Sequence, residues 1–278
     1  MKHLKIFFLS HIRFLFFICC LPLFAGMTVC IDAKIVFCVD GDIYIRNDDG
    51  TNRRRLTKNM VSEDRYPNWS PDGTRIAFIR RMDKKKGQTS GELFIMNADG
   101  KHLQRLTHND FSDSYLSWSP DGKRIAFTSG RSGKYEVHVV DMETLDVTQL
   151  TSGEGAQGAA VPDWSPDGTQ IVYEKFINNL VRRAGFAAGL SHKNIYVMSA
   201  DGENQRPLLP DPKPGADTVI MRFFPRWSSD GRRLVFKDCT WKKEITCRLS
   251  VMRIGGEIQV IQDIYDKLGE NLQIGSTR

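Results

Sequence analysis

The chain has 278 residues, of which 41% are hydrophobic and 26% charged, a composition typical of a globular protein with a sizeable core. Its formal net charge is +6, but the basic residues are spread among acidic ones and form no stripe with interleaved aromatic side chains. This pattern argues against a nucleic-acid partner and favours a mixed, solvated surface.

The N-terminal segment, residues 1–33, has the pattern of a secretory signal peptide. Lys2 and Lys5 precede an apolar stretch over residues 14–31. Cleavage after Ala33 is favoured because a strand-like segment follows. We therefore expect an exported protein, periplasmic or extracellular. The alternative is an uncleaved membrane anchor formed by residues 14–31, since about 18 apolar residues just span a bilayer.

Three cysteines lie beyond the leader. Cys239 and Cys247 flank a predicted hairpin, so they are candidates for a disulfide bond across two strands, which export would permit. The alternative is that both are buried, reduced thiols. Cys38 has no evident partner, and the spacing of the three residues does not support a zinc site.

A segment that begins Trp-Ser-Pro-Asp-Gly, or Trp-Ser-Ser-Asp-Gly in its last copy, occurs four times, with successive Trp residues 46 to 63 positions apart. Pro presets φ for a turn, Asp suits the next position, and Gly accepts the positive φ needed to re-enter a strand. An alternating strand such as Arg-Ile-Ala-Phe follows, then a second apolar strand, an Asp-Gly turn and a short fourth strand. The Trp and turn residues of the repeats are Trp69, Pro71, Asp72, Gly73, Trp118, Pro120, Asp121, Gly122, Trp164, Pro166, Asp167, Gly168, Trp227, Asp230 and Gly231.

Four short antiparallel strands in about 45–50 residues is the size of a propeller blade. One blade cannot bury both faces of its sheet, so neighbouring blades must stack. We therefore predict an all-β fold, a β-propeller of four-stranded antiparallel blades, over residues 34–278. Residues 34–37 supply a second strand with no first strand before it, and residues 271–275 of the tail are strand-like. The economical prediction is five blades closed by the tail; six blades or an incomplete ring is the alternative.

The tandem repeat resembles the propeller repeats of the TolB family, over about residues 34–262. It is also similar to the N-terminal propeller of dipeptidyl-peptidase-type and prolyl-oligopeptidase-type proteins. TolB carries an α/β domain before its propeller, and the peptidases carry an α/β-hydrolase domain; we expect a bare propeller here. Because TolB binds envelope proteins and peptides at its propeller, the resemblance implies a protein- or peptide-binding module of the cell envelope. It carries over no binding residue.

The sequence contains no Gly-x-Ser-x-Gly elbow, no His-Glu-x-x-His and no phosphate-binding loop. We therefore predict no enzymatic activity and no cofactor. Asp-rich turns such as residues 47–50 recur in several repeats, which favours a turn requirement over a calcium site. The regular place of Trp favours packing between blades over ligand stacking. Two alternatives stay open: a small-molecule enzyme of the metal-dependent lactonase or lyase type, and a scaffold module without activity of its own.

Function is expected where the repeats differ. Residues 176–193 interrupt one repeat, and insertions of this kind map to one face, often the binding face; the alternative is an ordinary loop. Residues 239–247 form a second divergent hairpin, and the channel ends are a third candidate region. The candidate binding residues are Arg182, Arg183 and Phe186 in the insertion, and Trp241 near the hairpin tip.

Overall fold

A computed structural model describes residues 34–59, 62–81, 90–153, 158–177, 192–212, 218–241, 245–256 and 258–264, the last range for its backbone only. The chain divides into two units, Met1–Asp32 and Ala33–Arg278, and every described residue belongs to the second. The expected signal peptide, the tail strand and the candidates Arg182, Arg183 and Phe186 lie outside the described residues.

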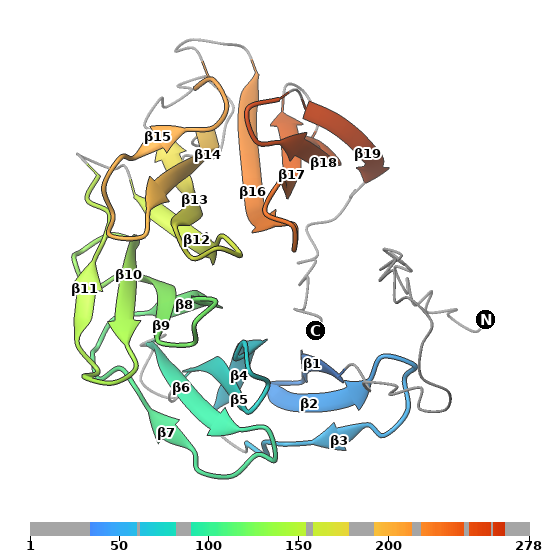
Figure 1. Cartoon of the computed structure of the whole chain (residues 1–278), viewed down its shortest axis with the longest axis vertical. Coiled ribbons are helices and arrows are strands. Elements are labelled where there is room, and N and C mark those ends of the chain that lie inside the picture. Colours follow the sequence, from blue (N-terminus) through green and yellow to red (C-terminus); the bar gives the residue numbers. More distant parts are fainter. Residues whose placement is uncertain are drawn as a thin grey trace, which may run out of the picture. The chain divides into compact units, whose positions relative to one another are not determined.

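Every regular element of the described residues is a strand, as the repeat predicts (Figure 1). The first sheet contains β1 (Lys34–Val39), β2 (Asp42–Asn47) and β3 (Arg54–Arg55). The second sheet contains β4 (Glu63–Trp69), β5 (Arg75–Arg81), β6 (Gly91–Asn97) and β7 (Gln104–Arg105). The third sheet contains β8 (Asp113–Trp118), β9 (Arg124–Ser129), β10 (Glu136–Asp141) and β11 (Val147–Gln149). In each of these sheets the strands pair antiparallel in chain order.

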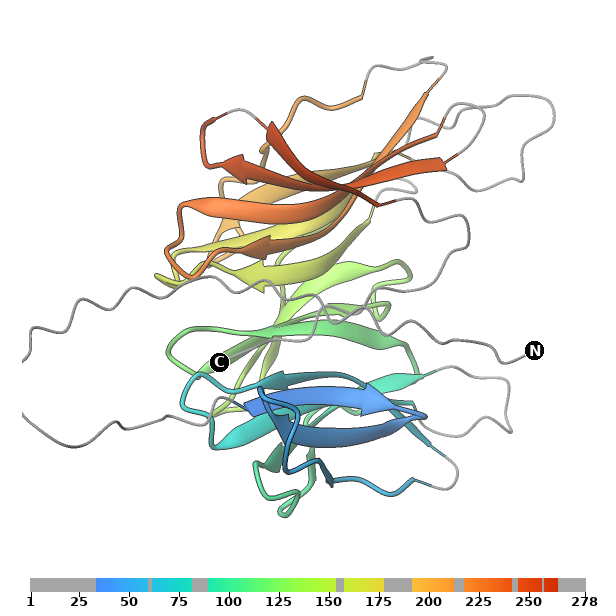
Figure 2. The same cartoon turned by 90° about the vertical axis from the view of Figure 1, so that its right-hand side faces the viewer.

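The last two repeats form an eight-stranded sheet. Its first half contains β12 (Ala159–Trp164), β13 (Gln170–Ile177), β14 (His192–Ser199) and β15 (Arg206–Pro207). Its second half contains β16 (Val219–Trp227), β17 (Arg233–Trp241), β18 (Ile245–Arg253) and β19 (Ile258–Ile264). A single parallel pairing, Lys193 with Met221, joins the halves. Each sheet contacts the one that follows it in the chain, which Figure 2 shows from the side.

The repeated turns share one geometry. In the first, the Gly73 N–H donates to the Ser70 carbonyl oxygen at 2.9 Å, and the Ser70 hydroxyl donates to Asp72 at 2.6 Å. The glycine that ends each of the four turns has φ between 66° and 71°. Only glycine adopts such a φ without strain, which explains why it closes every copy.

The repeated Trp side chains lie between successive sheets. Trp69, on the second sheet, packs with Val36, Ile43 and Ile45 of the first sheet. Trp118 packs in the same way on Leu93 and Ile95 of the sheet before it, and the Arg75 guanidinium lies 5.0 Å from the Trp118 ring. The hydrophobic core therefore lies between neighbouring sheets, which is how the stack buries faces that a single sheet leaves open.

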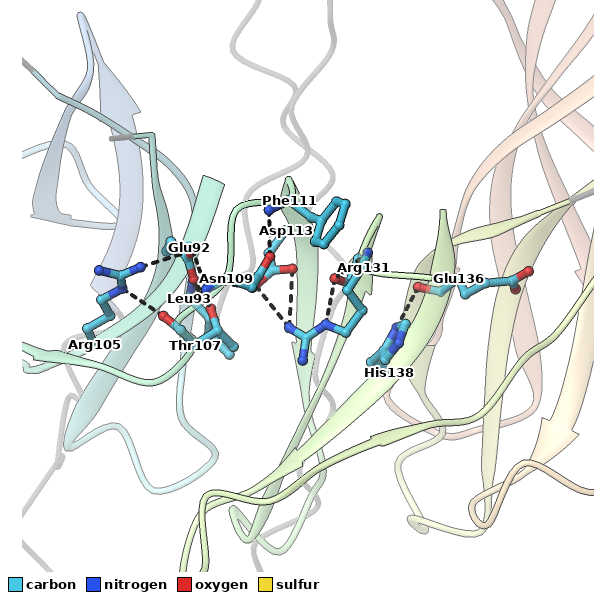
Figure 3. A network of polar contacts seen from close by, with 11 residues as sticks. Glu92, Leu93, Arg105, Thr107, Asn109, Phe111, Asp113, Arg131, Glu136 and His138 are labelled. Carbon is cyan, nitrogen blue, oxygen red and sulfur yellow. Dashed lines mark hydrogen bonds and ion pairs between the residues drawn. The ribbon is translucent and has the colours of Figure 1, made fainter. Parts of the chain in front are cut away.

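A second repeated feature joins the third strand of a repeat to its fourth (Figure 3). The Thr107 hydroxyl donates to Glu92 at 2.6 Å and accepts the Leu93 N–H at 2.9 Å. Thr151 does the same for Glu136 and Val137 at 2.5 and 2.9 Å. Burial raises the pKa of Glu92, although Thr107 and the Asn109 N–H oppose the shift. Because both carboxylates are fully buried and bonded to the protein's own donors, we interpret them as structural.

Candidate functional site

The first strands of four successive repeats, β4, β8, β12 and β16, all contribute to one cavity of about 540 Å³. We call it the inner-strand pocket. Its aromatic lining consists of Tyr66, Tyr115, Tyr135, Phe176, Phe223 and Phe224. A cavity of this size, with aromatic walls and a few polar groups, is typical of a ligand site.

Each first strand is bulged at the pocket. The residue three positions before the repeated Trp has a positive φ in all four: 54° at Tyr66, 45° at Tyr115, 54° at Val161 and 54° at Phe224. The pairing register of each strand with the next shifts at the same point. In three copies a proline follows the bulged residue, and a proline has no N–H to donate to the ladder. The bulge therefore directs one side chain of each strand to the pocket wall.

Three of these side chains meet there. The rings of Tyr66 and Tyr115 have their centroids 4.5 Å apart, and those of Tyr115 and Phe224 are 6.0 Å apart. Burial, together with the neighbouring Tyr66 hydroxyl, raises the pKa of Tyr115, so its phenol stays protonated at neutral pH. Residues 49 and 109 positions apart in the sequence thus build one continuous aromatic wall.

The wall is completed by one position on each second strand. This position directly follows the repeated Phe or Tyr and is occupied by Ile79, Thr128, Glu174 and Lys237. Thr128 accepts the Val161 N–H at 2.9 Å, and Glu174 accepts the Phe224 N–H at 2.8 Å. In these two cases the side chain from one repeat holds the bulge of the next repeat.

Glu174 is also paired with a cation. Its carboxylate lies 3.3 Å from Lys193 Nζ, which sits 4.4 Å from the centroid of the Phe176 ring and 4.7 Å from that of Phe223. Burial raises the pKa of Glu174, and Lys193 and the Phe224 N–H oppose that shift. The pair therefore fixes two aromatic side chains as well as the bulge.

Two arginines of the second sheet stand at another part of the wall. Arg65 lies 2.7 Å from Glu63, and Arg81 lies 3.9 Å from the same carboxylate. The hydrogen bond to Glu63 raises the pKa of Arg65 above its ordinary value. Asp113, also in the lining, is fully buried and lies 3.4 Å from Arg131 (Figure 3).

The structure places the predicted site residues as follows. Phe176 and Lys193, which flank the undescribed part of the 176–193 insertion, line the pocket, so the insertion starts and ends at its wall. Cys239 and Cys247 are joined by a disulfide bond between β17 and β18. Trp241, a candidate binding residue near the hairpin tip, is partly buried because it packs on the cluster around this disulfide.

The bulge residues and the positions after the repeated Phe were missed at the sequence level. Both lie just outside the aligned copies, which begin at Trp and end at Phe or Tyr. The sequence does contain a signal for the bulge in two copies. In each, an aromatic residue stands three positions before the Trp and is followed by Pro, as in Tyr66-Pro and Phe224-Pro. Extending the repeat by three residues at its start would have exposed it.

Among the residues that the structure describes, no group of three or more His, Cys, Asp or Glu side chains could hold a metal ion. The same part of the chain contains no helix with the length and apolar character needed to cross a membrane.

Comparison with known proteins identifies the family. The sequence profile of the TolB beta propeller domain matches residues 40–188, more than half of the chain. The chain belongs to this family. The resemblance inferred from the repeat is thereby confirmed, as is the all-β, antiparallel character of the fold.

Individual relatives are more distant. An uncharacterized protein of Agrobacterium fabrum, Atu1656, is 27% identical over 194 residues, which cover 70% of this chain and 60% of the relative. The chain therefore spans about 60% of the length of that curated relative.

Solved structures show the same fold. A TolB-type protein from Agrobacterium tumefaciens superposes with a TM-score of 0.65 at 20% identity, over 84% of this chain and 77% of that one. TolB from Acinetobacter baumannii superposes with a TM-score of 0.61 at 17% identity, over 83% of this chain and 53% of that one. An oligogalacturonate lyase from Vibrio parahaemolyticus superposes with a TM-score of 0.56 at 13% identity, over 83% of this chain and 62% of that one. At such identities the likeness concerns the fold alone, and a fold by itself does not determine function.

Proposed function

We propose that this member of the TolB beta propeller family is an exported, non-catalytic binding module of the cell envelope that holds a protein or peptide ligand in the inner-strand pocket. The observation that carries the proposal is the repeated bulge. A non-glycine residue in the left-handed region costs about 1–3 kcal/mol of strain, and here the strain recurs at the wall of a single cavity. Strain that persists at one place is typical of a site built for binding.

The pocket suits a polypeptide ligand for two reasons. Its aromatic wall offers rings at the sites where Tyr66, Tyr115 and Phe224 converge, and aromatic side chains are the commonest anchors of protein interfaces. Its cations supply polar contacts around that wall. Membership of the TolB beta propeller family supports the same role.

The test is ligand capture that depends on the pocket. Tagged protein is incubated with envelope extract, as wild type, as Tyr115→Ala, and as Leu103→Ala. Leu103 is 47% exposed and lies outside the pocket, so it is the matched control. We expect a partner retained by wild type and by Leu103→Ala and lost with Tyr115→Ala. Equal retention by all three proteins would reject the pocket as the binding site.

Export is part of the proposal. Residues 1–33 are proposed to be removed, leaving the domain 34–278 in the periplasm or outside the cell. Mass spectrometry of the chain recovered from the exported fraction should give the mass of residues 34–278. A full-length chain in the membrane fraction would instead support the anchor over residues 14–31.

We further propose that the propeller has five blades. The first three sheets are blades one to three, and the two halves of the eight-stranded sheet are blades four and five. Within the described ranges β1 pairs only with β2, so the first sheet has three strands where the next two sheets have four. Residues 271–275 are proposed as the missing strand beside β1. Deleting residues 265–278 should then speed amide exchange in β1; unchanged exchange would favour an incomplete ring.

A further inference from the structure

The inner-strand pocket has more positive than negative side chains. Its lining includes two carboxylates, those of Asp113 and Glu174, and four cations, Arg65, Arg81, Lys193 and Lys237. The cations come from two sheets, the second and the eight-stranded one. Any ligand that enters therefore meets basic groups on more than one wall.

The two lining carboxylates are already engaged by the protein. Asp113 accepts from Asn109 Nδ2 at 3.2 Å and lies 3.4 Å from Arg131. Glu174 holds the Phe224 N–H and Lys193. Both side chains are almost completely buried. They serve the wall and present little negative charge to a ligand.

The arginines of the second sheet are placed differently. Arg65 and Arg81 share one carboxylate, that of Glu63, and their side chains keep 37% and 40% exposure. Among the described residues, these two guanidiniums share one carboxylate, which leaves an excess of positive charge at this part of the wall. The guanidinium fork matches the geometry of a carboxylate better than any other side chain does.

The neighbouring aromatic wall adds a second requirement. Tyr66 follows Arg65 in β4, and its ring packs against that of Tyr115 at an interplanar angle of 41°. A small inorganic anion would use the arginines and leave these rings unused. A segment with an apolar side chain next to its carboxylate would use both.

We infer that the pocket selects an acidic peptide segment, in which an Asp or Glu lies next to an aromatic or large aliphatic side chain. The inference rests on the proposed function, since it names the chemistry of the ligand for the same pocket. Attraction between the basic wall and an acidic segment also speeds association and weakens as salt rises.

Three synthetic peptides test the inference by calorimetry on the mature chain, 34–278. They are acetyl-Gly-Asp-Trp-Asp-Gly-amide, its Asn-for-Asp analogue, and its Gly-for-Trp analogue. We expect the acidic aromatic peptide to bind about tenfold tighter than the Asn analogue, the range of charge-assisted hydrogen bonds. The advantage should shrink with added salt. The Gly analogue should bind most weakly.

Variants assign the effect to the wall. Arg81→Gln should remove most of the advantage of the acidic peptide over its Asn analogue. Lys101→Gln is the control, because Lys101 is a surface cation with 76% side-chain exposure outside the pocket. It should preserve the advantage. Circular dichroism checks that each variant is folded.

The outcomes separate the two proposals. If the Asp and Asn peptides bind with equal affinity, and Tyr115→Ala abolishes the binding of both, the acidic preference is overturned. The proposal that the pocket binds a peptide then stands. An advantage that survives Arg81→Gln would overturn the role of this wall. Absence of binding by all three peptides would overturn the inference, and capture of a partner that ignores Tyr115→Ala would overturn the proposed function itself.

Discussion

Glu174 illustrates how one side chain links the structure of the propeller to its pocket. Burial disfavours its charge, whereas Lys193 and the Phe224 N–H stabilise it. At the equivalent position of the third sheet, Thr128 makes the same kind of hydrogen bond to Val161 without a charge. The carboxylate therefore adds an ion pair to a contact that a hydroxyl already provides, and the ion pair orients Lys193 over two rings.

Glu174→Ala should lower the free energy of unfolding by about 2–3 kcal/mol, because it leaves Lys193 and the Phe224 N–H without their partner. Glu174→Gln, which keeps an oxygen to accept the N–H, should cost less. Glu143→Ala, at an exposed turn, is the control and should change stability by no more than about 0.5 kcal/mol. Urea denaturation measures all three; a loss as small as that of the control would contradict the assigned role.

The repeated turns predict a pH dependence. The Ser70 hydroxyl and then the Thr74 N–H lower the pKa of Asp72 to about 2. Because the folded-state pKa lies below the unfolded value of about 4, the ionised carboxylate stabilises the fold above pH 4. That contribution is lost as the pH falls from about 4 to 2.

The measurement compares wild type with Asp72→Asn. The difference in unfolding free energy between them should shrink over this pH window, and Ser70→Ala should raise the pKa of Asp72 in a carboxyl NMR titration. A difference that stays constant from pH 5 to pH 2 would show that the turn does not hold the carboxylate in this way.

At the scale of the element, the first strand of each repeat does two things at once. Its C-terminal end carries the Trp that packs on the preceding sheet, and its bulge faces the pocket. The turn that follows must then reverse the chain within four residues. The glycine at the end of that turn is needed for its φ and not for space.

A matched pair of glycines tests this point. Gly122 has φ +68°, and a Cβ there would meet only ordinary contacts, the nearest atom being 3.7 Å away. Gly122→Ala should therefore cost about 1 kcal/mol through backbone strain. A Cβ at Gly130 would also meet its nearest atom at 3.8 Å, and its φ is outside the left-handed region. Gly130→Ala should be neutral or slightly stabilising in thermal unfolding; equal losses at both positions would refute the explanation.

At the scale of the whole molecule, each sheet contacts mainly its neighbours in the chain. Stability is then close to a sum of terms for the sheets and for the interfaces between them. Removing a large core residue from one interface should therefore weaken that interface before the others.

Trp118→Ala tests this neighbour-by-neighbour cohesion. Trp118 is buried between the second and third sheets, and its removal should cost about 3–5 kcal/mol. Hydrogen exchange should lose protection in β6 and β8 before β17. Trp227→Ala, at a partly exposed Trp, should cost less and affect the eight-stranded sheet. Uniform loss of protection along the chain would show that the molecule unfolds as one unit.

The sequence predicted the strands, the turns and the family because those depend on near neighbours: turn chemistry, alternation of apolar residues, and copies that can be aligned. From Trp69 to Phe78 and its three copies, every strand boundary at the repeated Trp is found in the structure. The inner-strand pocket could not be read in this way. Tyr66, Tyr115 and Phe224 are far apart in the sequence, and they meet because stacking places four bulges at one wall.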